Sequence, residues 1–183
     1  VSSGGSMTDR PDTLKVDWQE AVRVAQLAES AGIEAIIPVA RWKGYGGPTN
    51  FNNRTFETFT WASAVAAATD YSCIFSTAHV PLVHPVTAAK QCATIDHISG
   101  GRFAFNIVCG WFRHEFEMFA AEWRQHDVRY EYAAEWLEFV QRIWREDKAL
   151  DFDGEYFSAK QVWSEPKPLQ TPSLPIMNAG GSP

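Results

Sequence analysis

One amide side chain inside an apolar run is the first candidate for chemistry in this sequence. Asn106 stands between Phe105 and Ile107, in a run that ends at a Gly110-Trp111 corner. An amide left unpaired in an apolar interior costs about 1–3 kcal/mol, so Asn106 must bond either the protein or a ligand. Ligands of parallel α/β sheets lie beyond the carboxyl ends of the strands, which favours a ligand contact. A satisfied core amide is the alternative, and the residue alone does not decide between the two.

A threonine and a histidine stand near the exit of the preceding apolar strand. We expect that strand over residues 72–77 and a loop over residues 78–85, so that Thr77 ends the strand and His79 lies in the loop. An imidazole titrates close to neutrality and can exchange a proton or a hydrogen bond with a ligand. A structural histidine is the alternative. The spacing of the histidines and cysteines fits no zinc site, so we expect no metal.

Two carboxylates follow the Asn106 strand with one residue between them. Glu115 and Glu117 have the residue type of an acid/base pair, but no second feature of the sequence supports glycosidase chemistry. We therefore treat them separately.

The composition limits both the partners and the compartment. The chain has 183 residues, 45% of them hydrophobic, which suits one sizeable core and a single domain over residues 1–183. Acidic residues number 22 against 16 basic ones, and the net charge of −6 argues against nucleic acid or an anionic membrane. No apolar stretch approaches bilayer length, and the polar beginning does not resemble a signal peptide. With three separated cysteines in apolar settings, we expect reduced thiols and a cytoplasmic protein.

Helices and short apolar strands alternate along the chain. The first helix follows Asp17, which forms a capping-box pattern with Glu20, and ends before Gly32. Further helices are expected at about 55–69, 85–98 and 128–145, and strands at 34–40, 72–77, 103–108 and 174–179. We expect a loop over residues 111–127 and a hairpin over residues 150–163, with Asp153-Gly154 as its turn. The longest helix has an apolar stripe of Tyr130, Ala133, Leu137, Val140 and Trp144.

This alternation predicts a parallel sheet built from βα units. The chain opens on a loop before a helix and stops directly after a strand. A complete eight-stranded barrel takes about 250 residues, which is more than this chain has. We therefore expect part of a (β/α)8 barrel, with the first strand before Val1 and the last three strands after Pro183.

Several blocks of the sequence resemble the bacterial-luciferase-like monooxygenases. They are residues 41–47 (RWKGYGG), 75–80 (FSTAHV), 89–102 (AKQCATIDHISGGR), 106–111 (NIVCGW), 115–116 (EF) and 126–130 (HDVRY). The similarity covers nearly the whole chain. It is greatest to the two-component branch that holds the alkanesulfonate monooxygenases, the dimethylsulfone monooxygenases and the pyrimidine-ring-opening oxygenase.

The resemblance implies an activity, a cofactor and partners. It implies a (β/α)8 TIM barrel that takes reduced FMN from a separate NAD(P)H-dependent flavin reductase. Together with O2 the flavin would oxygenate a small organic sulfur or nitrogen compound. The full-length protein would be a homo-oligomer, and the hairpin at 150–163 would lie in the insertion that helps cover the active site.

The resemblance also implies roles for individual residues. Val39 and Ala40 would lie beside the flavin ring, Asn106 would bond its polar edge or the oxygen, and Glu115 would belong to the same cofactor site. The ribityl chain and phosphate would face Arg129, Tyr130 and Ser182. Together with Asn106, Thr77 and His79 are the candidates for the side of the site that handles oxygen and substrate.

Some features leave alternatives open. Sulfonate-oxidising relatives often carry a cysteine early in the second helix, and here that place corresponds to Thr55, which weakens a sulfonate assignment. A deazaflavin-dependent oxidoreductase is one alternative, since some luciferase-like barrels use that cofactor. A non-catalytic, flavin-binding partial barrel is the other.

Overall fold

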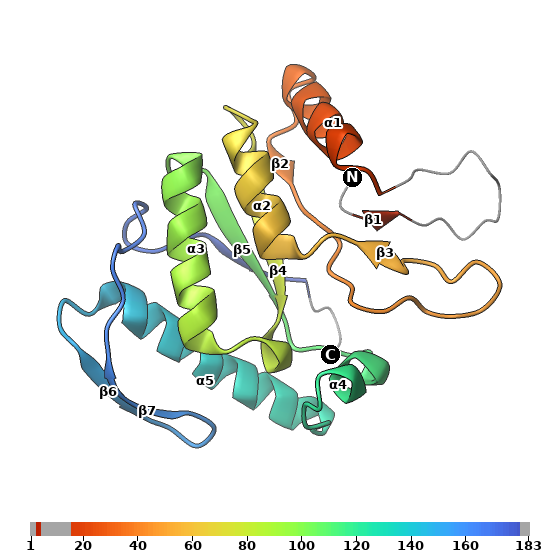
Figure 1. Ribbon diagram of the computed structural model, residues 1–183. Helices are drawn as coiled ribbons and strands as arrows, with labels where there is room; N and C mark the ends of the chain where they lie inside the picture. The colour runs from red at the N-terminus through yellow and green to blue at the C-terminus, as the bar shows by residue number, and fades with distance from the viewer. Residues whose placement is uncertain (1–2, 5–15, 180–183) are drawn as a thin grey trace.

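The computed structural model describes residues 3–4 and 16–179 of the chain. Its centre is a four-stranded parallel sheet with the strand order β2, β4, β5, β8. These strands are Ala35–Ile36 (β2), Cys73–His79 (β4), Phe103–Val108 (β5) and Ile176–Asn178 (β8). The helices α1, α2 and α3 lie in a row along one face of this sheet (Figure 1), as successive βα units require.

The bounds of the other elements complete the chain order. The helices on the sheet are α1 (Trp18–Ser30), α2 (Thr58–Ala67) and α3 (Pro85–Ser99), with the 3-10 turn η1 (Val80–Leu82) between β4 and α3. After β5 come α4 (Arg113–Met118), α5 (His126–Arg145), β6 (Leu150–Asp153) and β7 (Ser158–Val162). A small antiparallel pair joins β1 (Ser3–Gly4) to β3 (Arg54–Thr55).

The register of the parallel strands decides which side chains face the helices. In β5, Phe105 contacts Phe59 of α2 and Trp136 of α5, with ring centroids 5.7 and 6.0 Å apart. Because successive residues of a strand point to opposite faces, Asn106 points away from these helices. Thr77 is its direct neighbour on β4. Both polar side chains therefore lie on the face of the sheet that would form the inside of a barrel.

Side-chain caps and a left-handed glycine determine where α1 and α3 begin or end. The Asp17 carboxylate accepts a hydrogen bond from the backbone N–H of Glu20 at 2.9 Å, as predicted. The Glu20 carboxylate, however, pairs with Arg23, so this part of the capping box was wrong. The ring of His84 accepts the N–H of the second residue of α3 at 3.3 Å. Gly100 ends α3 with a φ of 64°, a left-handed conformation that glycine adopts without strain.

Two predicted elements are shorter than expected. The strand predicted at 34–40 is paired only over Ala35–Ile36, because Pro38 has no N–H to continue the ladder. The helix predicted from residue 55 begins at Thr58, after Glu57 caps its first turn. Thr55 lies in β3, before the helix begins, and not within the helix.

The strand that carries His79 is longer than expected. Ala78 and His79 continue the pairing of β4 with β5, opposite Ile107 and Val108. His79 was predicted to lie in a loop, but it is the last residue of a buried strand. This pairing fixes the backbone of His79 in the sheet.

The region after β5 also differs from the prediction. The expected loop at 111–127 contains the short helix α4. The hairpin turn is not Asp153-Gly154 alone, because residues 154–157 separate the two strands. The carboxylate of Glu135 on α5 accepts the backbone N–H groups of this turn, from Glu155, Tyr156 and Phe157, at 2.8–2.9 Å. The final strand is confined to Ile176–Asn178.

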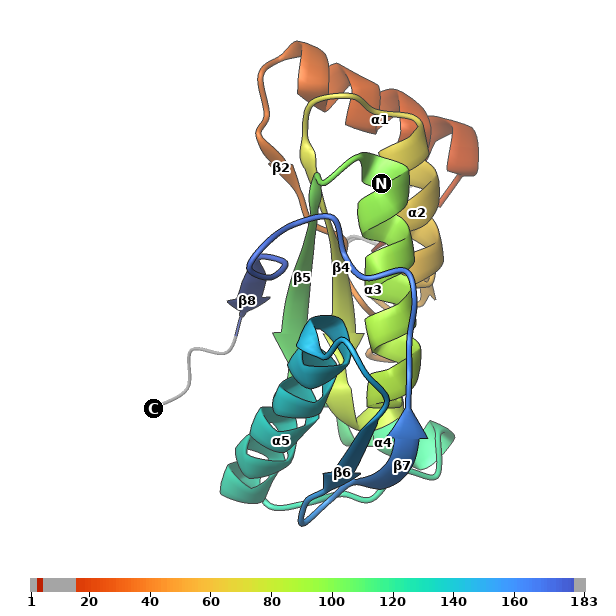
Figure 2. The ribbon, with the colours of Figure 1, turned by 90° about the vertical axis from the view of Figure 1, so that its left-hand side faces the viewer.

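Helix α5 attaches the hairpin to the sheet. Trp136, Phe139 and Ile143 are buried at the centre of its apolar face, whereas Tyr130 and Leu137 of the predicted stripe are only partly buried. Phe139 stacks on Phe152 of β6 with ring centroids 4.2 Å apart. Figure 2 shows α5, the hairpin and α4 at the end of the sheet to which the arrowheads of β4 and β5 point. Whether the hairpin covers an active site stays a prediction.

Candidate active site

A short chain of hydrogen bonds orients Asn106 at the carboxyl half of β5. Its Nδ2 donates to the hydroxyl oxygen of Thr77 at 3.1 Å, and this hydroxyl donates to the carbonyl of Pro38 at 3.3 Å. Thr58 of α2 donates in turn to the backbone carbonyl of Thr77 at 2.6 Å. Neighbouring strand ends and the start of α2 therefore hold the amide in one orientation.

The other end of the same amide has no partner among the described residues. The Oδ1 atom of Asn106 is buried and accepts no hydrogen bond from residues 3–4 or 16–179, and the residue is only 4% exposed. A buried acceptor without a donor costs about 1–3 kcal/mol. Asn106 is thus neither a fully satisfied core amide nor a free one. Its oxygen is an oriented acceptor that a ligand group could pair.

The second polar group of the site is a buried cluster of Arg41, Glu115 and His79. One carboxylate oxygen of Glu115 lies 3.3 Å from Nη1 of Arg41 and 3.3 Å from Nδ1 of His79. The contact to His79 has ion-pair distance but not hydrogen-bond alignment. The other oxygen accepts the backbone N–H of Trp42 at 2.7 Å and that of Lys43 at 3.4 Å. Glu115 is 2% exposed, so protein groups occupy both of its oxygens.

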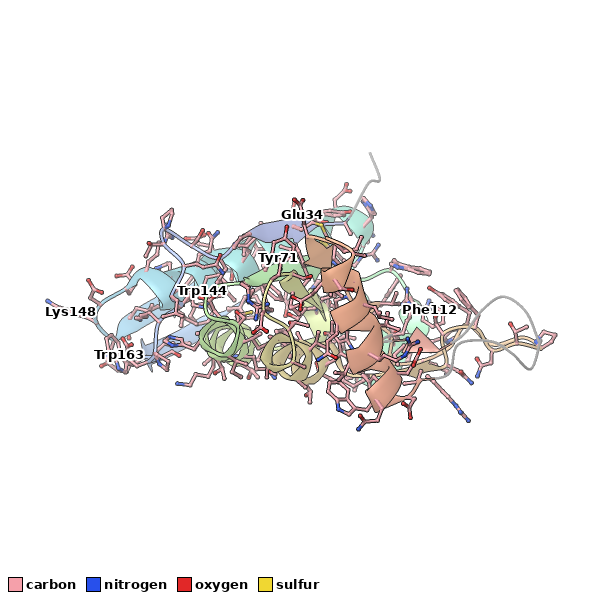
Figure 3. All side chains as sticks on the ribbon, turned by 90° about the horizontal axis from the view of Figure 1, so that it is seen from above. Glu34, Tyr71, Phe112, Trp144, Lys148 and Trp163 are labelled. Carbon is pink, nitrogen blue, oxygen red and sulfur yellow. The ribbon has the colours of Figure 1, made fainter. Side chains whose placement is uncertain are left out.

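Aromatic rings surround the guanidinium of Arg41. Its central carbon lies 4.6 Å from the ring of Trp111, 5.0 Å from that of Tyr45 and 5.6 Å from that of Phe112. Such cation–π contacts suit a cation that has lost most of its water. Figure 3 shows Phe112 on the opposite side of the molecule from Trp163, at the end of the hairpin. This cluster is therefore remote from that end of the hairpin.

The electrostatics of the cluster favour an uncharged His79. Burial lowers the pKa of His79, because a buried imidazolium loses its hydration. The carboxylate of Glu115 acts in the opposite direction and the positive charge of Arg41 lowers this pKa further. The ion pair of Arg41 with Glu115 thus cancels much of the field that would otherwise charge the histidine.

A narrow cavity lies beside these groups. Its volume is about 20 Å³, and its lining includes Ala40, Arg41, Thr58, Thr77 and His79. A space of this size holds about one water molecule. The cavity therefore has room for one water molecule between the start of α2, the end of β4 and the segment after β2.

Among the other predicted cofactor residues, Val39 and Ala40 follow the carboxyl end of β2. Val39 is 45% exposed and Ala40 is partly buried. Arg129, in the first turn of α5, donates to the carbonyl of Arg124 at 3.0 Å and lies 4.6 Å from the ring of Trp123. Its Nε is buried and finds no acceptor within the residues that the structure describes.

The last two predicted cofactor residues are Tyr130 and Ser182. Tyr130 is partly buried against the core, and its ring centroid lies 5.0 Å from that of His126. Ser182 lies outside the described residues. The hydroxyl of Thr55 donates to the backbone carbonyl of Arg41, so this residue braces the segment that follows β2.

The structure brings together all three residues predicted to act in catalysis, and it places Arg41 in one cluster with His79 through their shared contact with Glu115. Thr77, His79 and Asn106 lie on adjacent strands, as their placement near strand ends predicted. Arg41 was quoted only as part of a motif and received no role. One feature of the sequence could have indicated a role for Arg41. It is a positively charged residue directly after a predicted apolar strand, where a distant carboxylate such as Glu115 could pair with it.

The described residues also show what metal-binding, thiol and membrane-spanning features this part of the chain has. Residues 3–4 and 16–179 contain no group of three or more His, Cys, Asp or Glu that could hold a metal ion. The three cysteines carry free thiols. Burial raises the pKa of Cys92 well above its ordinary value, so it stays a thiol. No helix in the described part of the chain is long and apolar enough to cross a bilayer.

Comparisons with known proteins show the family. The family described as luciferase-like monooxygenase matches residues 2–183. The chain is 35% identical over 164 residues to a pyrimidine monooxygenase (RutA) of Bradyrhizobium sp. strain BTAi1, covering 88% of this chain and 44% of the relative. It is also 35% identical over 184 residues to an FMNH2-dependent dimethylsulfone monooxygenase of Pseudomonas putida, covering 98% and 48%.

A solved structure defines the fold class. EDTA monooxygenase (EmoA) from Chelativorans sp. BNC1 matches with a TM-score of 0.86 at 24% identity, over 99% of this chain and 48% of that one. The four parallel strands and their helices thus form part of a luciferase-type (β/α)8 barrel, as predicted. The chain belongs to the luciferase-like monooxygenase family. It spans about half the length of the curated relatives it matches.

Proposed function

We propose that this chain is the flavin-binding part of a monooxygenase that uses reduced FMN and O2 to oxygenate a small organic sulfur or nitrogen compound. The observation that carries the proposal is the buried, oriented Oδ1 of Asn106, for which the described part of the chain offers no donor. Membership of the family and the printed activities of the relatives support the choice of cofactor. FMN would supply the electrons that activate O2, while the protein positions the reactants.

The residues at the strand ends would orient the reactants. Asn106 would accept a hydrogen bond from the cofactor or substrate, with its amide held by Thr77. His79 would face the oxygen and substrate side as a neutral imidazole. Burial of all three residues would exclude bulk water from the reacting groups.

The cofactor itself would lie against residues of several elements. Val39 and Ala40 would border the flavin ring, and Arg129, Tyr130 and Ser182 would face the ribityl chain and phosphate. The partnerless Nε of Arg129 supports such an anionic contact. Glu115 belongs to this site, but its oxygens face protein donors. We assign it an indirect role, argued below.

The proposal includes partners and a compartment. A separate NAD(P)H-dependent flavin reductase would supply the reduced FMN, and the full-length protein would form a homo-oligomer in the cytoplasm. The relatives named above act on a pyrimidine and on dimethylsulfone. We favour such substrates over an alkanesulfonate, because no cysteine stands near the start of α2.

Flavin binding by the full-length protein tests the proposal. Oxidised and anaerobically reduced FMN are titrated against the wild type, Asn106→Ala and the control Asn53→Ala, which changes an exposed loop asparagine. We expect tighter binding of reduced FMN, weakened about tenfold in Asn106→Ala, because one buried hydrogen bond contributes about 1.4 kcal/mol. Equal binding by Asn106→Ala and the wild type contradicts the role of Asn106.

Oxygen consumption separates this function from the alternatives. With a flavin reductase and NAD(P)H, we expect O2 uptake coupled to loss of a sulfone or pyrimidine substrate. Hydride transfer with a deazaflavin and no O2 uptake would support the deazaflavin-dependent oxidoreductase instead. FMN binding without any turnover would leave a flavin-binding scaffold.

A further inference from the structure

We propose that Arg41 and Glu115 are positioning residues for His79: Glu115 orients its imidazole at the carboxyl end of β4, and Arg41 offsets the negative charge that this contact brings to the ring. The inference rests on the proposed function, in which His79 contacts substrate or oxygen. It assigns to Glu115 an action through other protein groups instead of a contact with the flavin.

The geometry around Glu115 supports an indirect role. The carboxylate lies on α4 and binds the two backbone N–H groups that follow Arg41, at 2.7 and 3.4 Å. The segment after β2 that contains Val39 and Ala40 is thereby tied to the helix after β5. The carboxylate is also in contact with Arg41 and His79, both at 3.3 Å. No described face of Glu115 is left open to a cofactor, because its side chain is only 3% exposed.

The charged groups facing His79 come from three directions. Glu115 approaches from α4 and Arg41 from the segment after β2. Glu57, at the start of α2, lines the same narrow cavity, but its carboxylate caps the N–H groups of Phe59 and Thr60 at 2.9 and 2.8 Å. On β5 the neighbour of His79 is Val108, which is apolar. Besides burial, one buried cation and one buried anion thus act on the protonation of the imidazole.

The protonation of the imidazole decides what His79 can do. Nδ1 faces the carboxylate of Glu115, which favours the proton on that nitrogen in the neutral ring. Nε2 is then left as an acceptor for a hydrogen-bond donor of the substrate or cofactor. If Arg41 were absent, the uncompensated carboxylate would draw a second proton onto the ring and remove this acceptor.

The test follows the protonation of His79 directly. Full-length protein labelled with [13Cε1]histidine is titrated by NMR without flavin over about pH 5.5 to 8.5, a range that brackets an ordinary imidazole. The His79 signal is identified by its loss in His79→Gln. We expect a neutral His79 down to pH values below its ordinary 6.5. A wild-type His79 that protonates at or above that value overturns the proposal.

Variants of the cluster sharpen the test. Arg41→Gln is expected to raise the pKa of His79, because the carboxylate of Glu115 loses its counter-charge, and Glu115→Gln is expected to lower it. Arg41→Lys keeps the charge and should restore most of the wild-type behaviour. Arg113→Gln, which removes an exposed arginine of α4, is the matched control and should leave His79 unchanged. An unchanged His79 in Arg41→Gln overturns the proposal.

The outcomes of the two proposals stay distinguishable. The titration needs no flavin, so a protein that fails to bind FMN can still show the predicted shifts at His79. Conversely, normal FMN binding together with an ordinary, charged His79 would leave the proposed function standing and remove this inference. Should Arg41→Gln not fold, the wild-type titration and Arg41→Lys still decide the question.

Discussion

Helix α4 carries two glutamates that differ mainly in burial, and each contacts an arginine and a histidine. Glu115 faces inward and meets Arg41 and His79, with side chains only 3–7% exposed. Glu117 faces outward and meets its helix neighbours Arg113 and His114, at 3.2 and 3.1 Å, with side chains 55–67% exposed. The chemical composition of the two clusters is the same, so their difference isolates the effect of the surroundings.

The main cause of the pKa shift differs between the two clusters. In the inner cluster, burial lowers the pKa of His79 because water no longer stabilises its charge. In the outer cluster, the hydrogen bond from His114 lowers the pKa of Glu117 because the ionised carboxylate is the better acceptor. Burial thus favours the neutral imidazole of His79 inside, while outside the exposed carboxylate of Glu117 keeps its charge to lower pH. Only the inner cluster can influence a site at the strand ends.

Removing one carboxylate should give the largest difference between the clusters, in the free energy of unfolding. In Glu115→Gln the guanidinium of Arg41 stays buried without a counter-charge, and breaking a buried pair costs about 3–5 kcal/mol. Glu117→Gln is expected to leave the free energy of unfolding unchanged within error, because solvent replaces the lost contact. Urea denaturation of the full-length variants measures both. Equal losses in the two variants would show that burial does not distinguish the clusters.

The pH dependence of stability should show a smaller difference. The lowered pKa of His79 means that below its ordinary 6.5 the unfolded chain binds a proton that the folded chain does not. Stability is therefore expected to fall as the pH drops below 6.5, by up to about 1.4 kcal/mol per pH unit. The lowered pKa of Glu117 acts only below its ordinary 4.5, where stability is lost as the pH falls.

Thermal unfolding between about pH 5 and 7.5 measures this dependence, a window that spans the ordinary pKa of histidine. The substitution His79→Gln should flatten the curve below pH 6.5, whereas His114→Gln should not. An identical slope in His79→Gln and the wild type would assign the dependence to other groups.

The response to salt should be the smallest effect. At about 1 M salt the Debye length is roughly 3 Å, so exposed charges are screened and buried ones are not. Any difference in melting temperature between the wild type and Arg113→Gln at low salt should vanish at high salt. A larger loss is expected in Arg41→Gln, because the buried carboxylate of Glu115 loses its counter-charge, and this loss should persist at high salt. A loss in Arg41→Gln that disappears with salt would show that water reaches this pair.

Much of the framework could be read from local patterns. The cap at Asp17 follows from backbone chemistry within a few residues, and the structure confirms it. The proximity of Thr77 to Asn106 follows from the rule that carboxyl ends of parallel strands lie together. His79 was predicted in the loop after β4, but it is the last residue of that strand. The end of a strand depends on how far the neighbouring strand pairs with it, which the local sequence does not show.

The details of the site were less accessible. Glu115 and Glu117 look equivalent along the chain, yet one is buried and the other exposed. Arg41 lies 74 positions from its partner Glu115. No local periodicity links residues so far apart, so the resemblance to the family suggested a cofactor role for Glu115 and none for Arg41.

The sequence by itself determined the alternation of helices and strands, their caps and the family, because these depend on short-range chemistry and on motifs. Only the tertiary structure decided which carboxylate of α4 is buried, which arginine neutralises it, and which atom of Asn106 lacks a partner. Burial and pairing are properties of the assembled sheet and helices. The same residue types therefore acquire different charges and roles according to where the fold places them.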